Sequence, residues 1–401
     1  MRKIFTLDVA LTTISVFIGL GLLSLVALRL DFLNPIVQNL QDFELNDVIF
    51  SQLAPTDLAD TNIVLVNIGN LSRADIAREI ERINLQNPKV IGLDAFFLNE
   101  KLPDLDDPLV LAISNARNKL VLVSKLRYND STKIFDSLVR SHPKFSAVTG
   151  FANFITDIEK GHKTVRTISP QERINSTLEK SFAVKISEKY NSTAAENFLA
   201  RGNTLEDINF RGNYQHFYTF DAPVVLDSSA DISIMRGKII LLGYMGESLE
   251  KPSLEDVFFT PLNPRPSGRS LPDMYGIVVH ANVISMILAG DCINSLPDRL
   301  GLALNILLAY CCVAAYSYLY LHRANWYDSL TVVISLGVPL LILFLQFYVF
   351  DQYRFKFNLT LGICAIAITG NVLEIYHEIL KNWFAKSKTI LKKETKKETQ
   401  A

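Results

Sequence analysis

Residues 62–98 read NIVLVNIGNLSRADIAREIERINLQNPKVIGLDAFFL. The runs at 62–68 and 89–98 are continuous, apolar and rich in β-branched residues, which is typical of strands buried on both faces. Between them, three isoleucines recur at helical spacing behind Ser72, a suitable N-cap. The stretch therefore predicts a right-handed βαβ unit and a parallel sheet.

The same pattern continues along the chain. Further strands are expected at Leu120–Leu126, Ala147–Ile155 and Lys238–Tyr244. Helices are expected at Asp107–Lys119, at Ile174–Tyr190 and at Tyr275–Leu288, where the last leads towards a membrane span. The predicted fold class is α/β, with a mostly parallel central sheet and helices on its faces.

Outside this domain, the sequence holds four apolar stretches. They are Val9–Leu28, Leu300–Leu321, Leu330–Phe350 and Phe357–Ile375. Each is long enough to cross a bilayer as a helix, so we expect one N-terminal and three C-terminal transmembrane helices. The first could be a cleaved signal peptide, but its apolar run is longer than a usual h-region and no small-x-small cleavage site precedes Asp31. We interpret it as an uncleaved signal anchor.

Basic residues in short loops are kept on the cytoplasmic side of a membrane. The N-terminus carries Arg2 and Lys3, and the tail after the fourth span is rich in lysine, whereas Arg354 and Lys356 between the last two spans argue weakly the other way. Both termini are therefore expected in the cytoplasm, in a bacterial-type inner membrane. The expected division is 1–30 for a stub and first span, 31–297 for a periplasmic or extracellular domain, 298–379 for the last three spans and 380–401 for a basic tail that contacts anionic lipid.

Composition argues against several classes of function. Residues 31–297 are net negative, so nucleic-acid binding is not expected. Cys292, Cys311, Cys312 and Cys364 give neither a disulfide framework nor a zinc-type spacing, so we expect no metal and no cofactor. No GxSxG, P-loop or HExxH motif is present, and we predict no catalytic residues and no enzyme activity.

Several motifs together resemble one known family. They are IVLVNI at 63–68, KVIGLDAFF at 89–97, NFRG at 209–212, RGKIILLGY at 236–244, TPL at 260–262 and GIVVHANVI at 276–284. The most specific element is GxxxHAN at 276–282. The chain resembles the CHASE type 2 domain, an extracellular sensory module associated with bacterial cyclases and histidine kinases. The resemblance covers residues 40 to about 380 and implies a sensory function.

The sequence departs from that family in two respects. Members often carry acidic residues at the end of the first strand, where Asn67 and Gly69 stand here, so a ligand site built on those acids would be altered. Members also commonly continue into a kinase or cyclase domain. Only about twenty residues follow the last span here, too few to fold a catalytic domain.

Four residues are candidates for ligand binding. Asp94, Asn67 and Gly243 lie at the carboxyl ends of predicted parallel strands, and Glu247 follows shortly after; ligands of open parallel sheets bind at that edge. For Asp94, the structural alternative is a helix cap or a pair with a buried cation.

Two further groups are candidates for coupling the domain to the membrane helices. His280 and Asn282 precede the second span, and His280 could respond to pH. The alternative is that both satisfy backbone groups where a helix packs on the sheet. Asn371, Glu374 and His377 lie at the end of the fourth span, where ionisable residues indicate function or an interfacial polar face.

The residues thus favour a non-catalytic, membrane-anchored sensor or accessory subunit. It would pass a signal through its spans to a separate membrane or cytoplasmic protein, and self-association into a homo-oligomer is a further option. The alternative is a structural scaffold subunit of a cell-envelope assembly.

Overall fold

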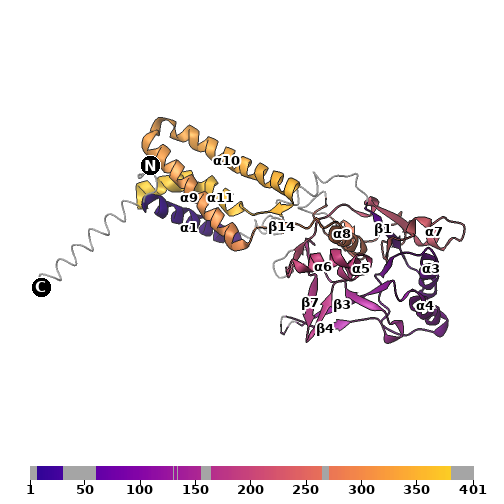
Figure 1. The fold of residues 1–401 in the computed structure, drawn as a ribbon. Helices are drawn as coiled ribbons and strands as arrows, with labels where there is room; N and C mark the ends of the chain where they lie inside the picture. Colours follow the sequence, from indigo (N-terminus) through magenta and orange to yellow (C-terminus); the bar gives the residue numbers. More distant parts are fainter. Residues whose placement is uncertain are drawn as a thin grey trace, which may run out of the picture. The chain divides into compact units, whose positions relative to one another are not determined.

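The computed structural model describes residues 7–29, 60–129, 131–132, 134–154, 164–263 and 271–380 (Figure 1). The chain separates into two compact units. One comprises residues 38–293 and the other residues 1–37 together with 294–401. Each unit has its own core and is described separately. The expected lead-in at 40–55 and the basic tail after residue 380 lie outside the described residues.

The unit of residues 38–293 is built on one central sheet. Its strand order is β10-β1-β11-β2-β3-β4, and β5 pairs with β3. The strands are β1 (Asp60–Asn67), β2 (Val90–Leu93), β3 (Leu120–Asn129), β4 (Ile134–Val139), β5 (Val148–Phe151), β10 (Phe217–Asp221) and β11 (Ile239–Gly243). All pairs are parallel except β3 with β4. The expected parallel sheet is confirmed, and β2 and β11 are buried along their whole length.

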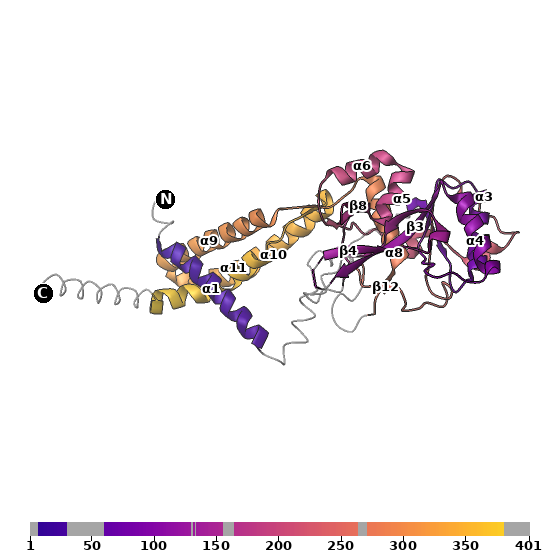
Figure 2. The same cartoon turned by 90° about the horizontal axis from the view of Figure 1, so that it is seen from below.

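Helices cover both faces of this sheet, as Figures 1 and 2 show. One face is packed by α3 (Arg73–Leu85), α4 (Pro103–Ala116) and α7 (Ala222–Leu226). The other face is packed by α5 (Phe182–Tyr190) and α8 (Gly276–Ala289), with α6 (Ser192–Ala200) beside them. Ser72 caps α3 by accepting a hydrogen bond from the Asp75 N–H, as predicted. Gly92 lets α5 approach the sheet, because a Cβ there would lie 2.5 Å from Ile186.

The expected helix at Ile174–Tyr190 is wrong in its first half. Residues Gln171–Ile174 and Thr177–Lys180 form an antiparallel hairpin, β7 and β8. Asn175 turns this hairpin with a φ of 53°, a left-handed conformation that asparagine tolerates. Ser181 then caps α5 by accepting from the Val184 N–H. The turn and the cap together delay the helix to Phe182.

The helix α8 also ends before the membrane segment begins. Gly290 closes it in a left-handed conformation with a φ of 69°. The next long helix, α9, starts only at Asp298. The two helices are therefore separate elements joined by a short extended piece.

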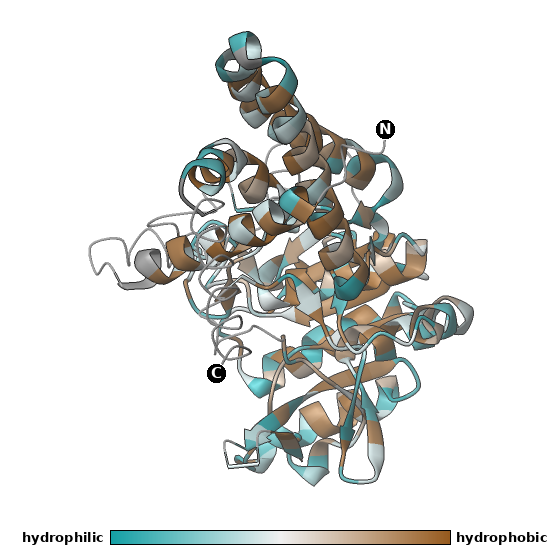
Figure 3. Cartoon of the chain, turned by 90° about the vertical axis from the view of Figure 1, so that its left-hand side faces the viewer, coloured by the Kyte–Doolittle hydropathy of each residue, from teal (hydrophilic) through white to brown (hydrophobic). Residues whose placement is uncertain are grey.

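Among the described residues of the second unit, four helices are long and apolar enough to cross a membrane. They are α1 (Leu7–Arg29), α9 (Asp298–His322), α10 (Ala324–Tyr353) and α11 (Thr360–Ile375), which ends in a π-helical turn at Tyr376–Leu380. In Figure 3, which colours each residue by its hydropathy, much of the helical ribbon is brown, the colour of hydrophobic residues. A short parallel pair joins β14 (Asn294–Ser295) to β15 (Phe355–Lys356).

Asn305 fastens α9 to α11 in this unit. Its Nδ2 donates to the carbonyl of Asn358, and its Oδ1 accepts from the Gly362 N–H at 2.6 Å. Gly362 leaves room for this contact, because a Cβ there would lie 2.8 Å from Leu308 of α9.

Candidate functional site

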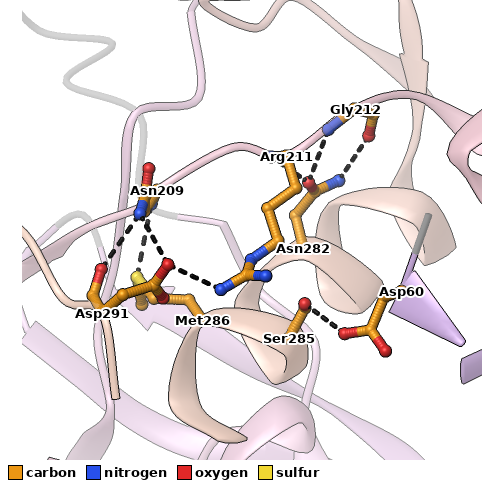
Figure 4. A network of polar contacts seen from close by, with 8 residues as sticks. All are labelled: Asp60, Asn209, Arg211, Gly212, Asn282, Ser285, Met286 and Asp291. Atoms are coloured by element: carbon orange, nitrogen blue, oxygen red, sulfur yellow. Dashed lines mark hydrogen bonds and ion pairs between the residues drawn. The ribbon is translucent and has the colours of Figure 1, made fainter. Parts of the chain in front are cut away.

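Asn282 lies at the centre of a polar network on α8 (Figure 4). This helix is almost entirely buried, and Asn282 itself has no exposed surface. Its Oδ1 accepts from the N–H groups of Arg211, at 2.7 Å, and Gly212, at 3.2 Å. Its Nδ2 donates to the Gly212 carbonyl at 2.9 Å and to Val278 within the helix. One amide therefore satisfies the backbone groups of Arg211 and Gly212 in the NFRG segment, 209–212, which belongs to no strand in the described part of the chain.

The same NFRG segment holds Asp291, the second residue after α8. Asn209 Nδ2 donates to the Asp291 carbonyl at 3.0 Å, and Arg211 Nη2 lies 2.6 Å from Asp291 Oδ2 (Figure 4). The Asn209 N–H also contacts Met286 Sδ at 3.3 Å. The motifs that the sequence places some 70 residues apart are thus joined directly, and they fix the end of α8.

A second anchor acts two residues further on. Arg201, at the end of α6, donates from Nη2 to the Ile293 carbonyl at 2.9 Å. Its Nε lies 2.7 Å from Glu206, which is almost fully buried. Charge-assisted bonds of this kind are stronger than neutral ones. We call Asp291–Ile293 the exit segment, because the chain leaves this unit through it.

A cavity of about 380 Å³ adjoins the exit segment. It is lined by Ala194, Asn197, Phe198, Arg201, Ile287, Leu288, Ala289, Gly290 and Cys292. The lining is mostly apolar with a few polar groups, and the volume falls in the range of small-molecule sites. The cavity therefore lies between α6, the end of α8 and the exit segment.

The opposite end of the described domain is also tied to α8. Ser285 Oγ donates to the carboxylate of Asp60, the first residue of β1 (Figure 4). The helix α8 thus contacts both the start of the sheet and the NFRG segment, which in turn holds Asp291.

Three of the four predicted ligand residues meet at the carboxyl edge of the sheet. Asn67 and Gly243 are register partners, and the Asp94 N–H donates to Leu242 in the same edge. Glu247 lies in the following loop, is exposed, and has its carboxylate 3.7 Å from Lys251. The ligand-binding role of these residues stays a prediction.

Asn67 has no hydrogen-bonding capacity left for a ligand. Its Oδ1 accepts from the N–H groups of Gly69 and Met245, and its Nδ2 donates to Asp221 and to the Gly246 carbonyl. Both donors and both lone pairs are therefore used to fix the loop after β11.

Gly243 has a packing role, whereas Asp94 carries a carboxyl group that can titrate. A Cβ on Gly243 would lie 2.7 Å from Ile277, so this glycine is required for the packing of α8. Asp94 follows β2 and is partly buried. Burial, with the nearby Asp256 carboxylate as the second cause, raises the pKa of Asp94 to about 7. Asp94 therefore changes its protonation near neutral pH.

His280 lies in the core of the domain, on α8. Its ring is 4.6 Å from that of Phe154 and 5.2 Å from that of Phe182. Burial lowers the pKa of His280 to about 3, so the ring stays neutral throughout the physiological range. This places the titration of His280 well below the range that a pH sensor would need.

The third predicted group separates into two environments. Asn371 and Glu374 are exposed on α11. His377 instead stacks on Tyr320 of α9, with ring centroids 5.1 Å apart. Only the first two residues share an open face.

The sequence did not single out Arg201, Glu206, Arg211 or Asp291. The sequence shows NFRG as a motif, but the identity of its partner depends on a contact between distant segments. Arginines and acidic residues are common in such a domain, so the sequence alone does not show which of them form a pair.

Comparison with known proteins adds the last observation. The family model described as CHASE2 domain matches residues 14–315, which is most of the chain. No curated protein and no solved structure matches.

Proposed function

The chain belongs to the CHASE2 domain family, a family of sensory domains, and from this premise we propose that it is a membrane-anchored sensor or accessory subunit without catalytic activity. Its α/β domain, residues 31–297, would lie outside the inner membrane of a bacterial cell. The segments 1–30 and 298–379 would supply the four spans, with both termini and the basic tail 380–401 in the cytoplasm. A separate membrane or cytoplasmic protein would receive the signal.

The observation that carries this proposal is the anchoring of the exit segment. Asp291 is held by Asn209 and Arg211, and Ile293 is held by Arg201. Only residues 294–297 then separate the domain from the first residue of α9. Two of these four residues, Asn294 and Ser295, are paired with Phe355 and Lys356, so only Leu296 and Pro297 are left to absorb a displacement. A rearrangement around the exit segment therefore reaches α9.

The cavity beside the exit segment is the site we propose for the signal molecule. Its lining includes Arg201, which holds the exit segment, and Cys292, which is part of that segment. A small, mostly apolar molecule bound there would contact α6 and the end of α8 at once. Binding energy could then shift the position of the exit segment, because a ligand shifts an equilibrium by its differential affinity for two states.

A binding experiment on the full-length protein tests this proposal. The protein is purified in mild detergent and its melting temperature is followed while pools of small apolar molecules are added. A sensor gives a saturable increase in melting temperature. Ala194→Trp fills the cavity and should abolish the increase. Ala200→Trp, on an exposed position of the same helix outside the cavity lining, should preserve it.

The scaffold alternative gives a different result in the same preparation. Proteins that copurify are identified and quantified by mass spectrometry. A scaffold subunit would retain partners in fixed ratio, with no saturable ligand and no effect of Ala194→Trp. That outcome would overturn the sensor proposal.

A further inference from the structure

One side of α11 carries exposed residues from Cys364 to Glu374. Cys364, Ala367, Asn371 and Glu374 are all exposed, and they follow one another at intervals of three, four and three residues. This spacing aligns them on one side of the helix. We call these four residues the outer stripe.

The other sides of α11 are occupied within its own bundle. Gly362 and Gly370 face Leu308 and Tyr316 of α9. A Cβ added at Gly19 of α1 would lie 3.7 Å from Ile368. The helix also packs against α10. The outer stripe is therefore not used to assemble the four helices.

Asn371 is the residue that makes this open face costly in a membrane. It lies eleven residues after Thr360, which at a rise of about 1.5 Å per residue is roughly 16 Å from the start of α11. The hydrocarbon core of a bilayer is about 30 Å thick, so a residue roughly 16 Å from the start of a spanning helix lies within it. Within the described part of the chain, the Asn371 side chain has no hydrogen-bond partner. An amide that faces lipid finds no water to take the place of a hydrogen-bond partner. It is therefore stabilised by contact with a polar group on another helix.

We propose that the outer stripe is a contact between two copies of this chain. All copies insert in one orientation, so two α11 helices run parallel and a two-fold axis sets each residue opposite its counterpart. The Asn371 amide both donates and accepts, which makes it complementary to itself. Cys364 and Ala367 are small enough for the helices to approach closely. Glu374 lies about one helical turn, roughly 4.5 Å, closer to the end of the span than Asn371, so its carboxylate can extend towards the membrane interface.

Cys364 supplies a direct readout for this contact. Cys292, Cys311 and Cys312 are replaced by serine, which leaves Cys364 as the only cysteine of the chain. Membranes containing the full-length protein are treated with copper phenanthroline and run on a non-reducing gel. A disulfide-linked dimer is expected. The matched control is Tyr348→Cys with Cys364→Ser. Tyr348 is an exposed residue of α10, five residues before Tyr353, where α10 ends, and thus similarly close to the connection with α11.

Two substitutions at Asn371 decide what holds the copies together. Asn371→Leu should reduce the dimer by roughly threefold or more, the size expected for an interhelical hydrogen bond in a membrane. Asn371→Gln keeps the amide and should keep the dimer. Leucine favours insertion, so loss of the dimer is not loss of the membrane helix. If Cys364 forms no more dimer than Tyr348→Cys, or if Asn371→Leu dimerises fully, the inference is wrong. The measurement uses no signal molecule, so its failure is distinct from failure of the sensor proposal.

Discussion

Arg211 Nη2 lies 2.6 Å from Asp291 Oδ2, joining the NFRG segment to the residue just beyond α8. Both side chains are partly exposed, at 27% and 38%, so solvent screens their attraction and the pair itself adds modest stability. Its importance is positional, because it fixes where the exit segment begins. Asn282, which is fully buried, supplies the stability that keeps Arg211 in place.

Replacement of Asn282 tests this division of roles. Asn282→Ala leaves two N–H groups and one carbonyl of the NFRG segment without a partner. Each buried unpaired group costs about 1–3 kcal/mol, so we expect a loss of at least about 3 kcal/mol of unfolding free energy. Asn115→Ala, at an exposed position of α4, is the control and should melt like the wild type. Equal melting of the two variants would show that the network does not stabilise the domain.

Glu79 should make the domain less stable as the pH rises. It is fully buried on α3, and neither carboxyl oxygen has a hydrogen-bond partner among the described residues. Burial, and next the charge of Asp75, raises the pKa of Glu79 from 4.5 to about 8. The unfolded chain therefore releases its proton at lower pH than the folded protein, and stability falls between about pH 4.5 and 8 by about 1.4 kcal/mol per unit.

Glu79→Gln removes this titration. The difference in melting temperature between the variant and the wild type should grow in favour of the variant from pH 5 to pH 8. A difference that is constant across this range would mean that Glu79 is ionised in the folded protein.

His280 should make the domain less stable as the pH falls below 6.5, which is opposite in direction to the effect of Glu79. Its pKa is lowered from 6.5 to about 3, so below pH 6.5 the unfolded state binds a proton that the folded state does not. The part of the stability that depends on a neutral His280 ring is complete above pH 6.5 and is lost as the pH falls, by about 2 kcal/mol at pH 5. His280→Phe should remove this loss, because phenylalanine keeps the ring contacts with Phe154 and Phe182. The slope of melting temperature between pH 6.5 and 5 is the measurement, and a variant with the wild-type slope would contradict the assignment.

The orientation in the membrane is tested by thiol labelling of intact cells. In a cysteine-free background, Asn129→Cys in β3 should react with a membrane-impermeant reagent. Ser387→Cys, which lies outside the described residues, should react only after the membrane is opened. Labelling of Ser387→Cys in intact cells would reverse the proposed topology.

The sequence predicted those features that depend on local pattern. The buried strands at 62–68 and 238–244 have continuous apolar runs, and Ser72 marks the start of α3 by its own side chain. The open face containing Asn371 and Glu374 also followed from helical spacing. The hairpin before α5 was missed, because strands of four residues are too short for a periodic signal. The exit anchors were missed for another reason: Arg201 and Ile293 are brought together only by the complete fold.

Hydrogen exchange of the full-length protein in lipid nanodiscs tests most directly whether the outer domain is coupled to α9 through the exit segment. Arg211→Ala is compared with Lys185→Ala, which removes only the side chain bonded to Glu188 on α5. The account predicts faster amide exchange for Arg211→Ala at residues 291–293 and in the first two turns of α9, with unchanged exchange in β1 and β11. Faster exchange confined to residues 209–212 and 291–293, with α9 exchanging as in the wild type, would contradict the coupling.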